Sequence, residues 1–144
     1  MRPFSIEEIS QEQASWIYPE TNGEYEPVHG EPDANRVAVK IRRFTPGQQE
    51  HIGQKMISKG VIRRRSRRGM DEIQTVPGRE LERYRMFAEA ICLDCRGITF
   101  PDGDGGYSHE GMAKAFLGMT GLFGAVHTAA LEFDDFFGVN GAGS

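Results

Sequence analysis

The sequence predicts a small α+β domain that is mainly helical, with one short β-hairpin or sheet. Apolar residues recur at helical spacing over 79–95 and 122–133, whereas 37–44 alternates between apolar and basic or small residues, as strands do. The 18 glycines cluster at 103–106 and between 111 and 143, which indicates bent or closely packed elements in the C-terminal third. At 144 residues the chain is expected to form one domain, over 1–133, that buries about two thirds of its unfolded surface.

The N-terminal part combines a predicted helix with an irregular loop. Ser5 to Glu8 form a capping-box pattern, which predicts a short helix over about 6–13. Residues 14–18 either continue that helix or form a strand, and Pro19 ends both. The stretch 19–35 is expected to be rich in turns, with a tight hairpin turn at Asn22-Gly23.

A strand that leads directly into a helix is predicted next. Residues 37–44 are the clearest strand of the chain, with their apolar residues on the buried face. Thr45 then suits the N-cap of a helix, followed by proline at N1 and glutamine at N3. This helix is expected to end near Lys59, with Ile52 and Met56 facing the core.

Residues 60–78 are interpreted as a mobile basic connection to the next helix. That helix, over about 79–93, has the clearest periodicity, because its apolar residues fall on one stripe. The members of the stripe are Leu81, Tyr84, Ala88, Ile91 and Cys95, with Phe87 beside them.

The C-terminal part is expected to hold a loop, two short helices and a tail. A glycine and aspartate loop precedes a helix over about 109–117, for which Ser108 is the N-cap. Gly118 and Gly121 then break or bend the chain. The last apolar stripe consists of Leu122, Val126, Ala129, Ala130 and Phe133. Residues 134–144 are predicted to be a flexible C-terminal tail.

Charge is strongly segregated along the chain. The net charge is −7 over 1–34, +10 over 36–68 and −7 over 69–144, although the whole chain carries only −4. Segment 59–68 holds six cations and no acid, and such a run must be solvated or paired with an anionic partner. No aromatic residue for base stacking lies within or near it, so a protein contact or a solvated loop is preferred over nucleic acid. The candidate contacts for an anionic partner are Lys59, Arg63, Arg64, Arg65, Arg67 and Arg68.

No pattern of catalytic or metal-binding residues emerges from the sequence. Cys92 and Cys95 have C-x-x-C spacing, but they close a predicted helix, where the dipole opposes thiolate formation, so two small, partly buried thiols are preferred. The loop at 102–106 begins like a calcium loop, yet Tyr107 and Ala113 stand where that loop needs glycine and glutamate. We therefore expect a protein that is not an enzyme and has no catalytic, metal-binding or cofactor-binding residue.

A membrane location is not expected. No apolar run approaches the roughly 20 residues of a membrane span, and the N-terminus lacks a basic-then-apolar signal pattern. With a mean hydropathy of −0.50, the chain is expected to be cytoplasmic and to have no membrane partner.

Several short motifs occur in a characteristic order. A strand runs directly into the helix capped by Thr45, a charged stretch follows, and the next helix ends in Asp94-Cys95-Arg96-Gly97-Ile98. An Asp-Gly loop at 101–106 and the helix from Ser108 complete the order. This order resembles the tail assembly chaperones of long-tailed (siphovirus-like) bacteriophages or prophages, most strongly over 79–133. The chain departs from the family pattern in the basic run and at Cys95, where an aromatic residue is expected.

The resemblance implies a non-enzymatic protein of the host cytoplasm that binds the long helical tape-measure protein and helps recruit tail-tube subunits. Apolar grooves between short helices can cover the apolar stripes that such a partner exposes before assembly. The alternative is that the apolar residues concerned form the domain's own core. The candidate partner-binding residues, on the bent helices at 108–133, are Phe116, Phe123, Val126 and Phe133.

Two alternatives from other classes stay open. A virion structural protein, such as a head–tail connector or a tail-completion subunit, would remain in purified particles, whereas a chaperone leaves before maturation. A nucleic-acid-binding regulator would act through segment 59–68, with an affinity that falls steeply with salt. Self-association of the chain is an additional candidate contact.

Overall fold

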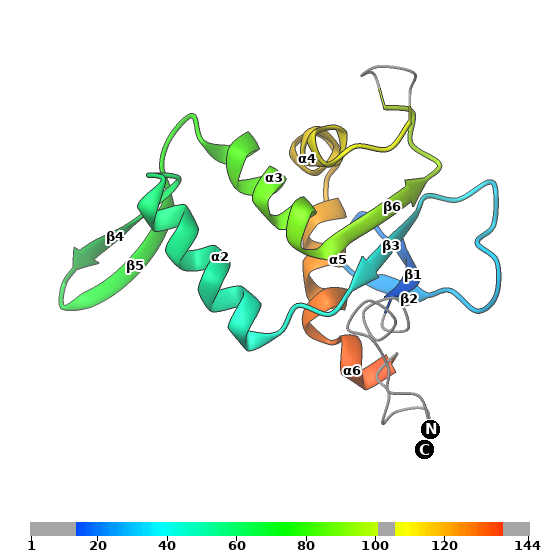
Figure 1. Ribbon diagram of the computed structural model, residues 1–144, viewed down its shortest axis with the longest axis horizontal. Coiled ribbons are helices and arrows are strands. Elements are labelled where there is room, and N and C mark those ends of the chain that lie inside the picture. The colour runs from blue at the N-terminus through cyan, green and yellow to red at the C-terminus, as the bar shows by residue number, and fades with distance from the viewer. Residues whose placement is uncertain (1–13, 101–105, 137–144) are drawn as a thin grey trace, which may run out of the picture.

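The computed structural model describes residues 14–100 and 106–136. Within these ranges, five helices and six strands form an α+β domain with two antiparallel sheets (Figure 1). The prediction of a mainly helical domain with one short hairpin or sheet is therefore wrong. Several of the strands lack a clear apolar alternation, so only their pairing in the fold reveals them. The predicted helix over 6–13 and most of the predicted C-terminal tail lie outside the described residues.

The larger sheet has the strand order β2-β1-β3-β6, with every neighbouring pair antiparallel. Its strands are β1 (Ala14–Pro19), β2 (Tyr25–Pro27), β3 (Ala38–Arg42) and β6 (Cys92–Arg96). The turn between β1 and β2 includes Asn22-Gly23, as predicted, but the loop spans 20–24 and is longer than the tight turn expected. The Asn22 side chain accepts a hydrogen bond from the Glu24 amide, and Gly23 has a φ of +86°. Residues 14–18 thus form a strand, and the strand predicted over 37–44 is confirmed with Val39 and Ile41 fully buried.

A bulge in β6 explains why both cysteines face the core. Ile41 pairs with Cys92 and Val39 with Cys95, so a step of two residues along β3 corresponds to a step of three residues along β6. The extra residue is Leu93, which is left partly exposed. The predicted helix over 79–93 is therefore too long, because the chain leaves the helix at Ile91 and continues as a strand.

The helices cover the larger sheet and each other. α5 packs against β1 and β3, and α3 packs against α4 and α2. The predicted caps are confirmed: Thr45 and Gln48 form a capping box, and Ser108 accepts a hydrogen bond from the Gly111 amide at 2.9 Å. Gly121 separates α4 from α5 with a φ of +81°. The helix bounds are α2 (Pro46–Ser58), α3 (Glu80–Ile91), α4 (His109–Gly118), α5 (Leu122–Leu131) and α6 (Phe133–Phe136).

The smaller sheet is a two-stranded hairpin, β4 (Ile62–Arg67) and β5 (Met70–Thr75), which we call the basic hairpin. It projects from one end of the molecule beside α2 (Figure 1). Arg68 and Gly69 join its strands with φ values of +53° and +76°, the positive values that a tight type I′ turn requires. Residues 60–78, which were expected to be a mobile connection, contain this ribbon. Its charged residues on both faces hide the strand pattern in the sequence.

Candidate binding cleft beside the basic hairpin

The residues predicted to line a groove on the bent helices belong to the core. Phe116 is 4% exposed, Val126 is fully buried and Phe133 is 1% exposed, while Phe123 is half-buried. Phe116 packs edge-on against Phe123 and against Tyr84 of α3, with ring centroids 5.3 and 5.8 Å apart. Phe116 and Phe123 therefore hold α3, α4 and α5 together. This agrees with the alternative that these residues form the domain's own core.

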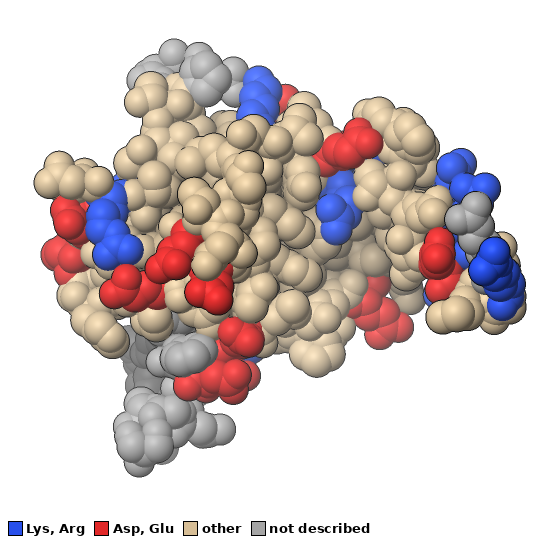
Figure 2. All heavy atoms as spheres, turned by 180° about the vertical axis from the view of Figure 1, so that it is seen from behind, with Lys and Arg blue, Asp and Glu red and all other residues tan. Residues whose placement is uncertain are grey.

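The predicted cationic residues gather on and beside the basic hairpin. Lys59 lies at the end of α2, Arg63, Arg64 and Arg65 lie on β4, and Arg68 lies in the turn, all of them exposed. In the register, Arg67 stands opposite Met70. Figure 2 shows this basic cluster at one end of the molecule, while most acidic side chains lie over the rest of that face. Across residues 14–100 and 106–136, none of the five exposed cations has a carboxylate within 4.0 Å.

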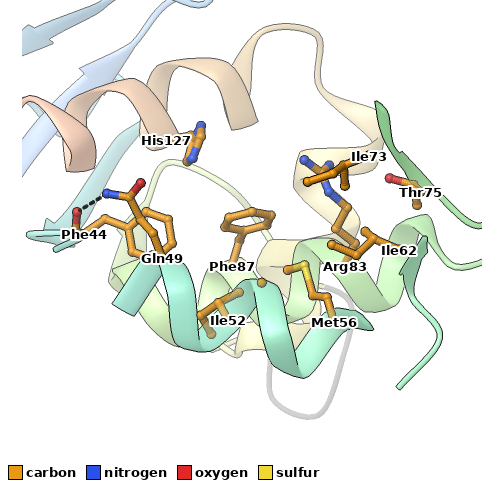
Figure 3. Close-up of a pocket in the computed structure, with 11 residues that line it drawn as sticks. Phe44, Gln49, Ile52, Met56, Ile62, Ile73, Thr75, Arg83, Phe87 and His127 are labelled. Carbon is orange, nitrogen blue, oxygen red and sulfur yellow. Dashed lines mark hydrogen bonds between the residues drawn. The ribbon is translucent and has the colours of Figure 1, made fainter. Parts of the chain in front are cut away.

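A partly open cleft lies where the basic hairpin meets the body, and we call it the hairpin cleft. Its cavity is about 250 Å³, with walls from α2, α3, α5 and the two hairpin strands (Figure 3). Phe87, Met56 and Ile62 form a buried apolar floor, whereas Ile73 stands at the edge and is 63% exposed. The remaining lining residues are Phe44, Gln49, Ile52, Gly53, Thr75, Arg83 and His127.

Two of the lining side chains, Arg83 and His127, can carry a positive charge. The guanidinium of Arg83 lies over the rings of Phe87 and Phe123, at 5.0 and 5.3 Å from their centroids. It is half-buried and has no carboxylate within 4.0 Å in the part of the chain that the structure describes. His127 stacks on Phe123, and burial, followed by the charge of Arg83, lowers the pKa of its imidazole. The cleft is therefore apolar, with a single half-buried cation that lacks an ion-pair partner.

Sequence reasoning missed the hairpin cleft, because it placed the binding surface on α4 and α5. The cleft residues come from segments up to 83 positions apart, between Phe44 and His127, and no local spacing brings them together. The sequence carried no signal specific to the cleft, because the polar strand β5 has two exposed apolar residues, Met70 and Ile73, and only Ile73 lines the cleft.

The paired cysteines are not arranged for thiol chemistry. Both are free, Cys92 is fully buried and Cys95 is 8% exposed. Burial raises the pKa of both thiols, and that of Cys95 reaches about 12. In the described part of the chain, no three histidine, cysteine, aspartate or glutamate side chains come together in a group that could hold a metal ion.

Among residues 14–100 and 106–136, no helix combines the length and the apolar character that a membrane span needs. Comparison of the chain with family models, curated proteins and solved structures found no match.

Proposed function

We propose that this protein is a non-enzymatic chaperone of phage tail assembly that acts in the host cytoplasm. It holds the helical tape-measure protein before assembly and helps recruit tail-tube subunits. The observation that carries the proposal is the hairpin cleft, an apolar cavity with exposed Ile73 at its edge and unpaired cations around it. Exposed apolar residues beside a cavity are typical of surfaces that bind other proteins.

The cleft suits a protein partner better than a metabolite. At about 250 Å³ its cavity is smaller than the roughly 300–1,000 Å³ of most small-molecule sites. An unassembled tape-measure helix exposes apolar stripes, and a groove that accepts individual side chains is the usual way to cover such a helix. The motifs at 94–98 and from Ser108, which resemble those of tail assembly chaperones, support the same proposal.

Co-expression tests this function directly. The full chain is produced with and without the tape-measure protein encoded in the same phage genome, and the soluble tape-measure protein is quantified. We expect the chain to keep the tape-measure protein in solution and to co-purify with it, and to be missing from purified virions. A tape-measure protein that stays insoluble, or a chain found at fixed copy number in mature particles, would reject the proposal; the second result would favour a head–tail connector or tail-completion subunit.

One observation favours a second function, contact with nucleic acid through the basic hairpin. A two-stranded ribbon fits the major groove of B-form DNA, and four exposed arginines lie on this ribbon or in its turn. Against it, Asp71 and Glu72 stand opposite Ser66 and Arg65, where they would repel phosphates. Titration with duplex DNA at several salt concentrations decides between the two functions, because each phosphate contact contributes about −0.9 to the slope of log K against log salt.

A further inference from the structure

We propose that the hairpin cleft binds an acidic amphipathic helix, which inserts an apolar side chain between α2 and the basic hairpin and places a carboxylate beside Arg83. The inference rests on the proposed function for the source of this helix, the tape-measure protein. The chemistry of the helix is argued from the cleft itself.

The size and lining of the cleft suit an inserted apolar side chain. Its volume corresponds to about eight water molecules at about 30 Å³ each, which is room for one or two aliphatic side chains. Buried Phe87 and Met56 form the floor, and Ile73 at the edge can close over an inserted group. Covering Ile73 and filling the cavity would remove apolar surface from water on both partners.

The position of Arg83 indicates that the bound partner helix is acidic. Within the described residues, the half-buried guanidinium of Arg83 lies against aromatic rings at the cleft and has no carboxylate within 4.0 Å. A carboxylate that arrives with the partner would form charge-assisted hydrogen bonds with it, in a site that the inserted side chain shields from water. A lysine at the same position would instead be repelled.

The register of the basic hairpin adds a second cation on the same side. Arg64 stands directly opposite Ile73, and residues that oppose each other in an antiparallel pair share a face of the ribbon. The same face carries Ile62 and Thr75, which line the cleft. Arg64 therefore lies beside the cleft edge, where it extends the positive field of Arg83 along a bound helix.

This arrangement fits an acidic helix better than duplex nucleic acid. The cations nearest to the cleft, Arg64 and Arg83, stand beside apolar side chains, whereas a phosphate backbone offers no apolar group to fill the cavity.

The test uses three labelled helical peptides of about 18 residues, or five turns, that share one leucine stripe. Their flanking positions are all glutamate, all glutamine or all lysine, and binding to the full-length chain is followed by fluorescence anisotropy at physiological salt. We expect the glutamate peptide to bind at least about tenfold more tightly than the lysine peptide, with the glutamine peptide between them.

Substitutions then locate the site. Arg83→Gln should weaken binding of the glutamate peptide about tenfold or more, and Ile73→Gln about three- to tenfold. Ile73 is exposed, so its variant should fold even where the Arg83 variant does not. The matched controls are Arg85→Gln, two residues along α3 on the exposed side, and Leu117→Gln, an exposed apolar residue of α4; both should bind as the unchanged chain does.

Several outcomes would overturn the inference. They are equal binding of all three peptides, no saturable binding of the glutamate peptide up to about 1 mM, and affinity unchanged by both cleft variants. A cleft occupied by a second copy, seen as a dimer in light scattering that excludes the peptide, would also overturn it. If the peptides fail to bind but co-expression keeps the tape-measure protein soluble, the proposed function stands and the contact lies outside the cleft. If the glutamate peptide binds but co-expression fails, the cleft binds an acidic helix from a different partner.

Discussion

Replacing Phe116 by alanine distinguishes between two roles for this side chain: it either packs in the core of the domain or contacts a partner. Phe116 is 4% exposed and packs edge-on against Tyr84 and Phe123. Removing the ring would leave a cavity between α3, α4 and α5 and delete two aromatic contacts. If the side chain belongs to the core, its loss should appear in stability before it appears in binding.

The magnitude follows from the burial of the ring. Phenylalanine-to-alanine substitutions in cores cost about 3–5 kcal/mol, and the two edge-on contacts favour a value of about 4 kcal/mol here. With an unfolding entropy of about 2.1 cal/mol/K per residue, 144 residues give about 0.3 kcal/mol/K, so Tm should fall by about 13 °C. That loss is a large part of the 5–15 kcal/mol that stabilises a typical domain.

The assay is urea unfolding followed both by far-UV circular dichroism and by the fluorescence of Trp16, the single tryptophan, which lies half-buried in β1. Coincident transitions would justify a two-state free energy. The control is Leu117→Ala, one position further along α4 at 57% exposure, which should change stability by no more than about 0.5 kcal/mol. A loss below about 1.5 kcal/mol for Phe116→Ala, together with weaker partner binding, would refute the core assignment and restore the predicted groove.

Three further predictions concern other parts of the molecule. Gly121→Ala should lower the free energy of unfolding in urea by at least about 2 kcal/mol, because φ is +81° and a Cβ would collide with the Thr21 carbonyl. Gly118→Ala, which has open space around it, is the control and should be neutral or slightly stabilising. Equal effects of the two substitutions would contradict this prediction. The pKa of His127 is lowered in the folded chain, so the unfolded chain binds its proton at higher pH. The free energy of unfolding should therefore fall as pH drops below 6.5 and level off below the folded-state pKa. His127→Phe should remove up to about 1.4 kcal/mol per pH unit of that slope, and an unchanged slope would contradict the prediction. Buried Cys92 and Cys95 should resist iodoacetamide at pH 8 in the native chain and react readily in urea; mass spectrometry showing rapid native labelling would mean that the cysteine-bearing strand opens.

Local signals in the sequence were sufficient for the helix starts and for one strand. The hydroxyl oxygens of Thr45 and Ser108 cap their helices by accepting hydrogen bonds from amides three residues away, so neither cap depends on the rest of the fold. The alternation over 37–44 and the position of the turn at Asn22-Gly23 are equally local signals, although the loop around that turn is longer than predicted. The stripe from Leu122 to Phe133 was also sufficient to identify buried residues, although it did not show that they face the domain's own sheet rather than a partner.

Elements that depend on distant partners were not predictable in this way. β6 continues the helical stripe of α3 in sequence, and it becomes a strand because Val39 and Ile41 of β3 provide an edge with which to pair. The sequence of the basic hairpin suggests a charged connection, because a ribbon that is exposed over most of its length needs no apolar alternation. Strand pairing over such separations is decided by the fold as a whole.

The sequence by itself determined the segregation of charge, the main helices and the lack of a recognisable catalytic motif. Only the tertiary structure decided where the cations lie and what stands beside them. It places the basic hairpin next to α2 and α3, so that Ile73 and half-buried Arg83 border one cavity although they belong to different elements. The physical reason is that binding surfaces are built from residues that are neighbours in space, and spacing along the chain records only the neighbours within a single helix or strand.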